Sequence, residues 1–170
     1  VDTTAILLPI YNEDIAYVYA GLKSIYQSLE RSGNLQHFEF YILSDSDDAS
    51  NWLREEAASS VLCRDLGQTT RIHYRRRKHR TKKKSGNVMD FCRRWGRRHP
   101  YMVVLDADSL ITGDALVRMV DAMDRNPRVG LVQAPLYTIG LDTLYARGQQ
   151  FVNRLYGAIC FAGLHFWWLG

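Results

Sequence analysis

The sequence predicts an α/β fold in which a mostly parallel sheet carries helices on both of its faces. Apolar segments alternate with segments of helical periodicity, which is the pattern of strands joined by helical crossovers. Two of the apolar segments end in clusters of aspartate, and ligands bind at such strand ends in open α/β sheets. A length of 170 residues with 46% hydrophobic side chains fits one domain with a substantial core.

The first half of the chain predicts three strands and two helices. In the first helix apolar side chains recur at helical spacing up to Ser32, with Asn12 as the N-cap and Gly33 as the stop. The second helix has a less regular apolar pattern. The expected strands are Thr3–Pro9, Phe38–Ser44 and Thr69–Tyr74, and the second helix is Asn51–Leu66, packed through Trp52, Leu53 and Val61.

The second half continues the alternation. An amphipathic helix follows residue 87 and ends at Pro100, and the apolar segment 101–105 then reads as a short strand buried on both faces. Asn126-Pro127 predicts a turn. The remaining expected elements are a helix at Asp114–Met123, a fifth strand at Val129–Gln133, and a helix at Leu141–Tyr156 that continues into an aromatic-rich segment at 158–169.

Asp106 and Asp108 directly follow the strand at 101–105. Residues i and i+2 of an extended segment point the same way, so the two carboxylates are expected to converge. Two like charges held that close need protonation, a Lys or Arg, or a metal ion between them. Mg²⁺ is a natural candidate, because it takes one or two carboxylates and completes its shell with water and phosphate oxygens. A solvated turn is the alternative that the pattern leaves open.

The basic run Arg75–Lys84 concentrates the positive charge of the chain. It holds eight Lys or Arg, so removing it takes the formal net charge from +4 to −4. The run could contact an anionic membrane surface, form a solvated loop, or close over a bound diphosphate. We do not expect nucleic-acid binding, because no aromatic stacking platform is interleaved with the charges.

Several common classes of site and segment are missing from the sequence. Three scattered cysteines and five scattered histidines give no metal-ligand spacing or even disulfide set, which suits a reducing compartment. No signal peptide and no apolar run long enough to span a bilayer is visible. Because the chain stops at Gly170 within an apolar, aromatic segment, we expect it to be part of a longer protein.

Neither glycine-rich phosphate-binding motif is present, which argues against a Rossmann dehydrogenase and a P-loop NTPase. Acidic strand ends without such a loop instead suggest a diphosphate bridged by a metal ion. In that arrangement the cation supplies the positive charge and stabilises a leaving group that departs as a phosphate.

Four motifs in this order resemble those of family 2 glycosyltransferases. They are Pro9-Ile10-Tyr11-Asn12-Glu13 after the first strand, Asp45 at the end of the second, Lys84-Ser85-Gly86-Asn87, and Asp106-Ala107-Asp108. The resemblance implies the Rossmann-like GT-A fold of this family, here its donor-binding half, in a single domain 1–170 that is truncated on its C-terminal side.

The resemblance also implies a role for each motif residue. Pro9, Tyr11 and Glu13 would hold the uridine of a nucleotide sugar, with Asp45 on the base. Lys84, Gly86 and Asn87 would lie near the nucleotide and its diphosphate. Asp106 would contact the ribose and the metal, and Asp108 would be the principal ligand of Mg²⁺ or Mn²⁺.

Longer segments narrow the resemblance to bacterial family members that make osmoregulated periplasmic glucans. These segments include YILSDS, DFCRRWG, YMVVLDADS and DTLYARGQQF. The resemblance implies UDP-glucose as donor and a growing β-glucan as acceptor. It also implies a cytoplasmic domain at the bacterial inner membrane, anchored through the rest of the protein.

The chain departs from the family pattern downstream. It has neither the Thr-Glu-Asp-like motif that carries the general base nor the Gln-x-x-Arg-Trp motif that grips the acceptor. An inverting displacement needs that base on the far side of the sugar. We therefore predict that this chain binds donor but does not transfer glucose alone.

Two other functions fit parts of the sequence pattern. A haloacid-dehalogenase-type phosphatase also places Asp-x-Asp after an apolar strand, although Leu110 stands where that class usually has Thr or Val. A non-catalytic sensor of nucleotide sugars or polyanions would use the basic run instead.

Overall fold

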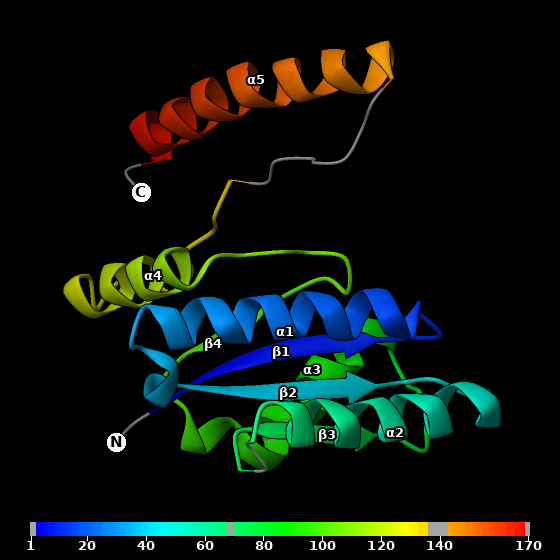
Figure 1. The fold of residues 1–170 in the computed structure, drawn as a ribbon. Coiled ribbons are helices and arrows are strands. Elements are labelled where there is room, and N and C mark those ends of the chain that lie inside the picture. Colours follow the sequence, from blue (N-terminus) through cyan, green and yellow to red (C-terminus); the bar gives the residue numbers. More distant parts are fainter. Residues whose placement is uncertain (1–2, 68–69, 136–142, 169–170) are drawn as a thin grey trace. The chain divides into compact units, whose positions relative to one another are not determined.

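The computed structural model describes residues 3–67, 70–135 and 143–168. These residues fall into two compact units, 1–127 and 128–170, and each unit is described by itself (Figure 1). The expectation that residues 1–170 form one truncated domain remains a prediction.

The first unit is built on a four-stranded sheet with the order β3-β2-β1-β4, in which every neighbouring pair is parallel. Its long central strands are paired along their whole length, from Thr4 opposite Phe38 to Ile10 opposite Ser44. All four strands therefore end at the same edge of the sheet. The strands are β1 (Thr4–Ile10), β2 (Phe38–Ser44), β3 (Ile72–Arg76) and β4 (Met102–Val104).

Helices cover both faces of this sheet, as the sequence predicts. The larger core packs Ile6, Leu8 and Ile10 against side chains of α1, α2 and α4, whereas Leu7 and Leu43 face α3 on the other side. The predicted α/β class with a parallel sheet is thus confirmed. The helices are α1 (Ile15–Arg31), α2 (Ala49–Asp65), α3 (Lys83–Trp95) and α4 (Gly113–Arg125), with short 3₁₀ turns at Leu35–His37 and Gly96–Arg98.

Two helix starts differ from the expectation. Asp14, not Asn12, caps α1, because its side chain accepts a hydrogen bond from the backbone N–H of Tyr17. Asn12 instead has a φ of 52°, in the left-handed region, within the connection between β1 and α1. The start of α3 at Lys83 places the Lys84–Asn87 motif in its first helical turns, and β3 runs into the basic run as far as Arg76.

The buried face of α2 is also not the expected one. Leu53 and Val61 are 54% and 50% exposed, while Glu55 and Ser59 are buried together with Leu62. The apolar pattern was misleading here because Glu55 accepts hydrogen bonds from Ser44 and Tyr74 on the sheet, which lets a polar side chain face inward.

Two strand predictions need correction. The segment before Asp106 forms β4 at the sheet edge, and Met102 and Val104 are exposed rather than buried on both faces. Val129–Gln133 forms no strand, because its backbone pairs with no strand among the described residues, and Leu131 is 79% exposed.

The second unit contains one long helix, α5 (Leu144–Trp168), where the sequence predicts a helix and an aromatic continuation. The first residues of that expected helix, 141–142, and residue 169 lie outside the described residues. Within the described part of the chain, no helix combines the length and the apolar character that a bilayer crossing requires.

Candidate functional site

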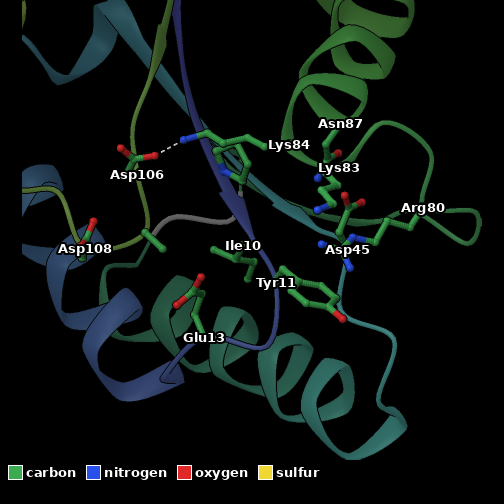
Figure 2. Close-up of a pocket in the computed structure, with 12 residues that line it drawn as sticks. Ile10, Tyr11, Glu13, Asp45, Arg80, Lys83, Lys84, Asn87, Asp106 and Asp108 are labelled. Carbon is green, nitrogen blue, oxygen red and sulfur yellow. Dashed lines mark hydrogen bonds and ion pairs between the residues drawn. The ribbon is translucent and has the colours of Figure 1, made fainter.

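A cavity of about 500 Å³ lies at the edge of the sheet where β1, β2 and β4 end (Figure 2). We call it the strand-end cavity. It gathers side chains from four separated segments, and the parallel sheet brings them together because its strands all end on this side. Its lining includes the predicted residues Pro9, Tyr11, Glu13, Asp45, Lys84, Asn87, Asp106 and Asp108, and also Ile10, Arg80, Lys83 and Ala107.

Hydrogen bonds to the end of β2 hold the loop that carries Tyr11. The hydroxyl of Tyr11 and the side-chain amide of Asn12 donate to the two oxygens of Asp47, each at 3.0 Å. These two bonds, led by the one from Asn12, lower the pKa of Asp47. The guanidinium of Arg80 lies over the Tyr11 ring, 3.4 Å from its centroid, so a cation from the basic run covers the aromatic face (Figure 2).

Asp45 is 5% exposed and paired with a cation that the sequence reading did not single out. Arg77 donates from Nε to Oδ1 at 2.8 Å and from Nη2 to Oδ2 at 2.6 Å. The same guanidinium donates to the backbone carbonyls of Thr81 and Lys83. Arg77 therefore ties the basic run both to the end of β2 and to the start of α3.

Glu55 lies behind these strand ends and is 1% exposed. Its carboxylate accepts hydrogen bonds from the hydroxyls of Ser44 at 2.6 Å, Ser46 at 2.5 Å and Tyr74 at 3.0 Å. Ser46 in turn accepts from the backbone N–H of Asn12 at 2.9 Å. Glu55 thus connects α2, through Ser46, to the loop that carries Tyr11.

Asp106 and Asp108 both line the strand-end cavity, but not for the expected reason. β4 ends at Val104 and the chain turns at 107–108, so the two residues do not lie in one extended segment. Both carboxylates are exposed, and Asp106 is paired with the ammonium of Lys84 (Figure 2). One of the three expected ways to offset the charge, a lysine, is therefore present at Asp106.

The donor chemistry at this point fits a hard divalent cation. Among the described residues, no group of three His, Cys, Asp or Glu side chains could hold a metal ion. Two exposed carboxylates on one cavity suit an ion that takes its remaining ligands from water and phosphate, as Mg²⁺ does. For a metal ion to bind here, the ammonium of Lys84 would have to release the Asp106 carboxylate or share it with the ion.

Gly86 and Asn87, the other predicted site residues of the Lys84–Asn87 motif, lie in different surroundings. Asn87 is 1% exposed and donates to the carbonyl of Leu43 at 2.8 Å, while its Oδ1 is buried without a hydrogen-bond partner. Gly86 does not line the strand-end cavity. A Cβ at this position would collide with the carbonyl oxygen of Thr81, so Gly86 lets the basic run pack on α3.

Arg77, Arg80, Lys83 and Glu55 are site residues that the sequence did not predict. The two arginines were inside a run of like residues, and nothing local separates them from their neighbours. Glu55 lies on the same face of α2 as Ser59 and Leu62. Because Glu55 and Ser59 are polar, the sequence predicts that this face is exposed to solvent.

Comparison with known proteins assigns the chain to a family. The family model described as Glycosyl transferase family 2 matches residues 5–168. Proteins named Glucans biosynthesis glucosyltransferase H are similar to it over 167 residues, or 98% of the chain: the one from Pectobacterium carotovorum subsp. carotovorum (strain PC1) is 53% identical and the one from Escherichia coli (strain K12) is 50% identical.

The chain spans about 20% of the length of these two relatives. Among solved structures, "Crystal structure of S. aureus TarS 1-349" matches with a TM-score of 0.48 and 12% identity, over 80% of this chain and 40% of that one. The family match and the high identity to the curated relatives cover nearly the whole chain. The chain therefore belongs to glycosyltransferase family 2.

Proposed function

We propose that this chain holds the nucleotide-sugar donor of a glycosyltransferase, with UDP-glucose as the donor and a growing β-glucan as the acceptor. The observation that carries the proposal is the strand-end cavity, which collects eight of the nine residues expected to bind donor or metal. The curated relatives are named for the biosynthesis of glucans by a glucosyltransferase, which supports glucose as the sugar.

The cavity offers different chemistry to the two ends of a nucleoside diphosphate. Tyr11 presents an aromatic face of the kind on which a base stacks, and Asp45 presents a buried acceptor for its ring N–H. Lys83 and Lys84 supply positive charge for the diphosphate. Arg80 covers Tyr11 in this structure, so base stacking requires that the guanidinium move aside.

Asp106 and Asp108 would hold Mg²⁺ or Mn²⁺ in this function. A bound divalent cation supplies charge stabilisation to the diphosphate that leaves. Lys84, which pairs with Asp106 and lines the same cavity, would then be available to donate to a phosphate oxygen.

We propose an inverting reaction whose base and acceptor site come from other parts of the protein. The chain carries no Thr-Glu-Asp-like or Gln-x-x-Arg-Trp motif. By itself it is then expected to bind donor without transferring glucose. In the whole protein the domain would face the cytoplasm at the bacterial inner membrane, with membrane contact through the remaining parts and no nucleic-acid partner.

Calorimetric titration of UDP-glucose tests this proposal. Binding is expected in Mg²⁺ or Mn²⁺ and lost on addition of EDTA. Asp108→Asn is expected to abolish the metal-dependent part, whereas Asp121→Asn, at an exposed position of α4 outside the cavity, retains it. Binding that neither EDTA nor Asp108→Asn weakens would contradict the assignment of the carboxylates.

A further inference from the structure

A second cavity, of about 440 Å³, lies between the basic run and α3. We call it the basic cavity. It shares no lining residue with the strand-end cavity, and its lining includes part of the basic run together with Gly86 of the Lys84–Asn87 motif. Its cationic lining residues are Arg75, Arg76, Arg77, Lys78, Arg93 and Arg94.

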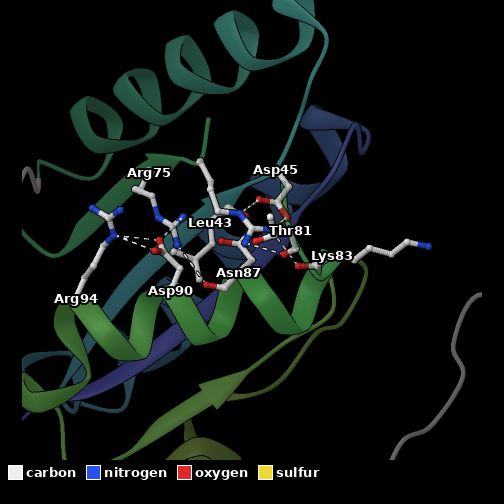
Figure 3. Close-up of polar contacts among 9 residues, drawn as sticks. Leu43, Asp45, Arg75, Thr81, Lys83, Asn87, Asp90 and Arg94 are labelled. Atoms are coloured by element: carbon white, nitrogen blue, oxygen red, sulfur yellow. Dashed lines mark hydrogen bonds and ion pairs between the residues drawn. The ribbon is translucent and has the colours of Figure 1, made fainter. Parts of the chain in front are cut away.

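Carboxylates compensate only part of this charge. Asp90 pairs with Arg75 at 3.1 Å and with Arg94 at 3.1 Å, and Figure 3 shows both arginines reaching toward it, Arg94 from α3 and Arg75 from β3. Asp45 pairs with Arg77. Within the described residues, no carboxylate pairs with Arg76, Lys78 or Arg93, so the cavity keeps an excess of positive charge.

Arg75 lines the basic cavity and has a donor atom without a hydrogen-bond acceptor. Its side chain is 16% exposed, and burial lowers the pKa of its guanidinium. The Nε atom is buried without a hydrogen-bond partner, which is an unfavourable state for a charged donor. The same guanidinium donates to the backbone carbonyl of Asn87 at 3.4 Å, and an anion in the cavity would offset its charge.

The cavity is preformed by close packing. Gly86 lines it, and the absence of a side chain there lets the Thr81 backbone approach α3. Arg77 holds the same segment by donating to the backbone carbonyls of Thr81 and Lys83. Arg75 and Arg77 are held by Asp90 and Asp45, so they present positive charge to an anion at a smaller entropic cost than the exposed Lys78 and Arg93 do.

We propose that the basic cavity binds a compact phosphate-bearing anion of about diphosphate size, at a site distinct from the strand-end cavity. Arg76, Lys78 and Arg93 line the cavity without a carboxylate partner among the described residues, and Arg75, whose Nε is buried without a hydrogen-bond partner, lines it as well. This inference does not rest on the proposed function.

The test is a titration of inorganic pyrophosphate into the purified protein. Because the strand-end cavity can also attract pyrophosphate, the titration uses a variant in which that cavity is weakened. Lys84→Gln weakens the strand-end cavity alone, and this variant is expected to retain pyrophosphate binding. Adding Lys78→Gln and Arg93→Gln to it is expected to weaken binding roughly tenfold or more, since hydrogen bonds to charged groups are lost. Arg118→Gln with Arg125→Gln on α4 changes the net charge equally outside the cavity and serves as the control.

Two readouts separate the outcomes. In ¹⁵N spectra of the Lys84→Gln protein, pyrophosphate is expected to shift the amides of Gly86 and Met89, which line the basic cavity. Equal losses in the cavity and control variants would indicate non-specific charge attraction and overturn the proposal, as would unshifted Gly86 and Met89 amides. Binding only to vesicles containing phosphatidylglycerol, and not to pyrophosphate, would overturn it in favour of a lipid surface.

Discussion

Arg77 grips both carboxylate oxygens of Asp45, with Nε 2.8 Å from Oδ1 and Nη2 2.6 Å from Oδ2. The side chains are 9% and 5% exposed, so the pair is shielded from water. It joins the end of β2 to the basic run, and it places one residue of the basic cavity in direct contact with the strand-end cavity.

Removing both partners of this pair is expected to cost less stability than the sum of removing each one alone. Arg77→Met leaves a buried carboxylate without its cation and is expected to lower the free energy of unfolding by about 3 kcal/mol. In the double variant Asp45→Asn with Arg77→Met, the loss is expected to be smaller than the sum of the two single losses. Urea unfolding measures all three, and strictly additive losses would contradict a direct pair.

Glu55 is expected to matter for stability although it is a carboxylate on a helix. Glu55→Ala leaves the hydroxyls of Ser44, Ser46 and Tyr74 without their acceptor, at about 1 kcal/mol each, so a total loss of about 3 kcal/mol is expected. Glu56→Ala, at the exposed neighbouring position, is the control and should stay within about 0.5 kcal/mol. Equal effects of the two variants in urea unfolding would place Glu55 at the surface.

Two glycines at the ends of α3 should respond differently to alanine. At Gly86 a Cβ meets the Thr81 carbonyl, so Gly86→Ala is expected to push the basic run off the helix and destabilise the protein by about 1–3 kcal/mol. At Gly96 the nearest atom to a new Cβ is 3.5 Å away, an ordinary contact, so Gly96→Ala should be neutral or slightly stabilising. Thermal unfolding compares the two, and indistinguishable midpoints would argue against close packing at Gly86.

Stability is expected to fall at alkaline pH. Burial raises the pKa of Tyr19, Tyr41 and Tyr74 above the ordinary value of 10.0. Above that pH the unfolded chain loses tyrosine protons that the folded chain keeps, so the free energy of unfolding decreases by about 1.4 kcal/mol per pH unit for each such proton. The stabilising effect is therefore complete below pH 10 and is lost progressively above it.

Urea unfolding between pH 8 and pH 11 measures this dependence. Tyr41→Phe removes one of the three phenols and should reduce the slope above pH 10. An unchanged slope in this variant would show that Tyr41 ionises equally in both states.

The sequence by itself determined the parallel α/β class, because hydrophobic periodicity is a local property that records which side of each segment faces the core. It located α1 and the central strands within one or two residues. It also placed Tyr11, Asp45 and Asp106 at strand ends, and parallel strands that end at one edge bring such residues together.

Only the tertiary structure shows which side chains and which strands pair with one another. Arg77 meets Asp45 across 32 residues, and Glu55 turns inward because the hydroxyls of Ser44 and Tyr74 on the sheet and of Ser46 after β2 satisfy it. β4 lies at an edge, and Val129–Gln133 pairs with no strand among the described residues, although both segments are apolar. Whether a charge is buried or an apolar segment is exposed depends on neighbours distant in sequence, and only the folded chain specifies those neighbours.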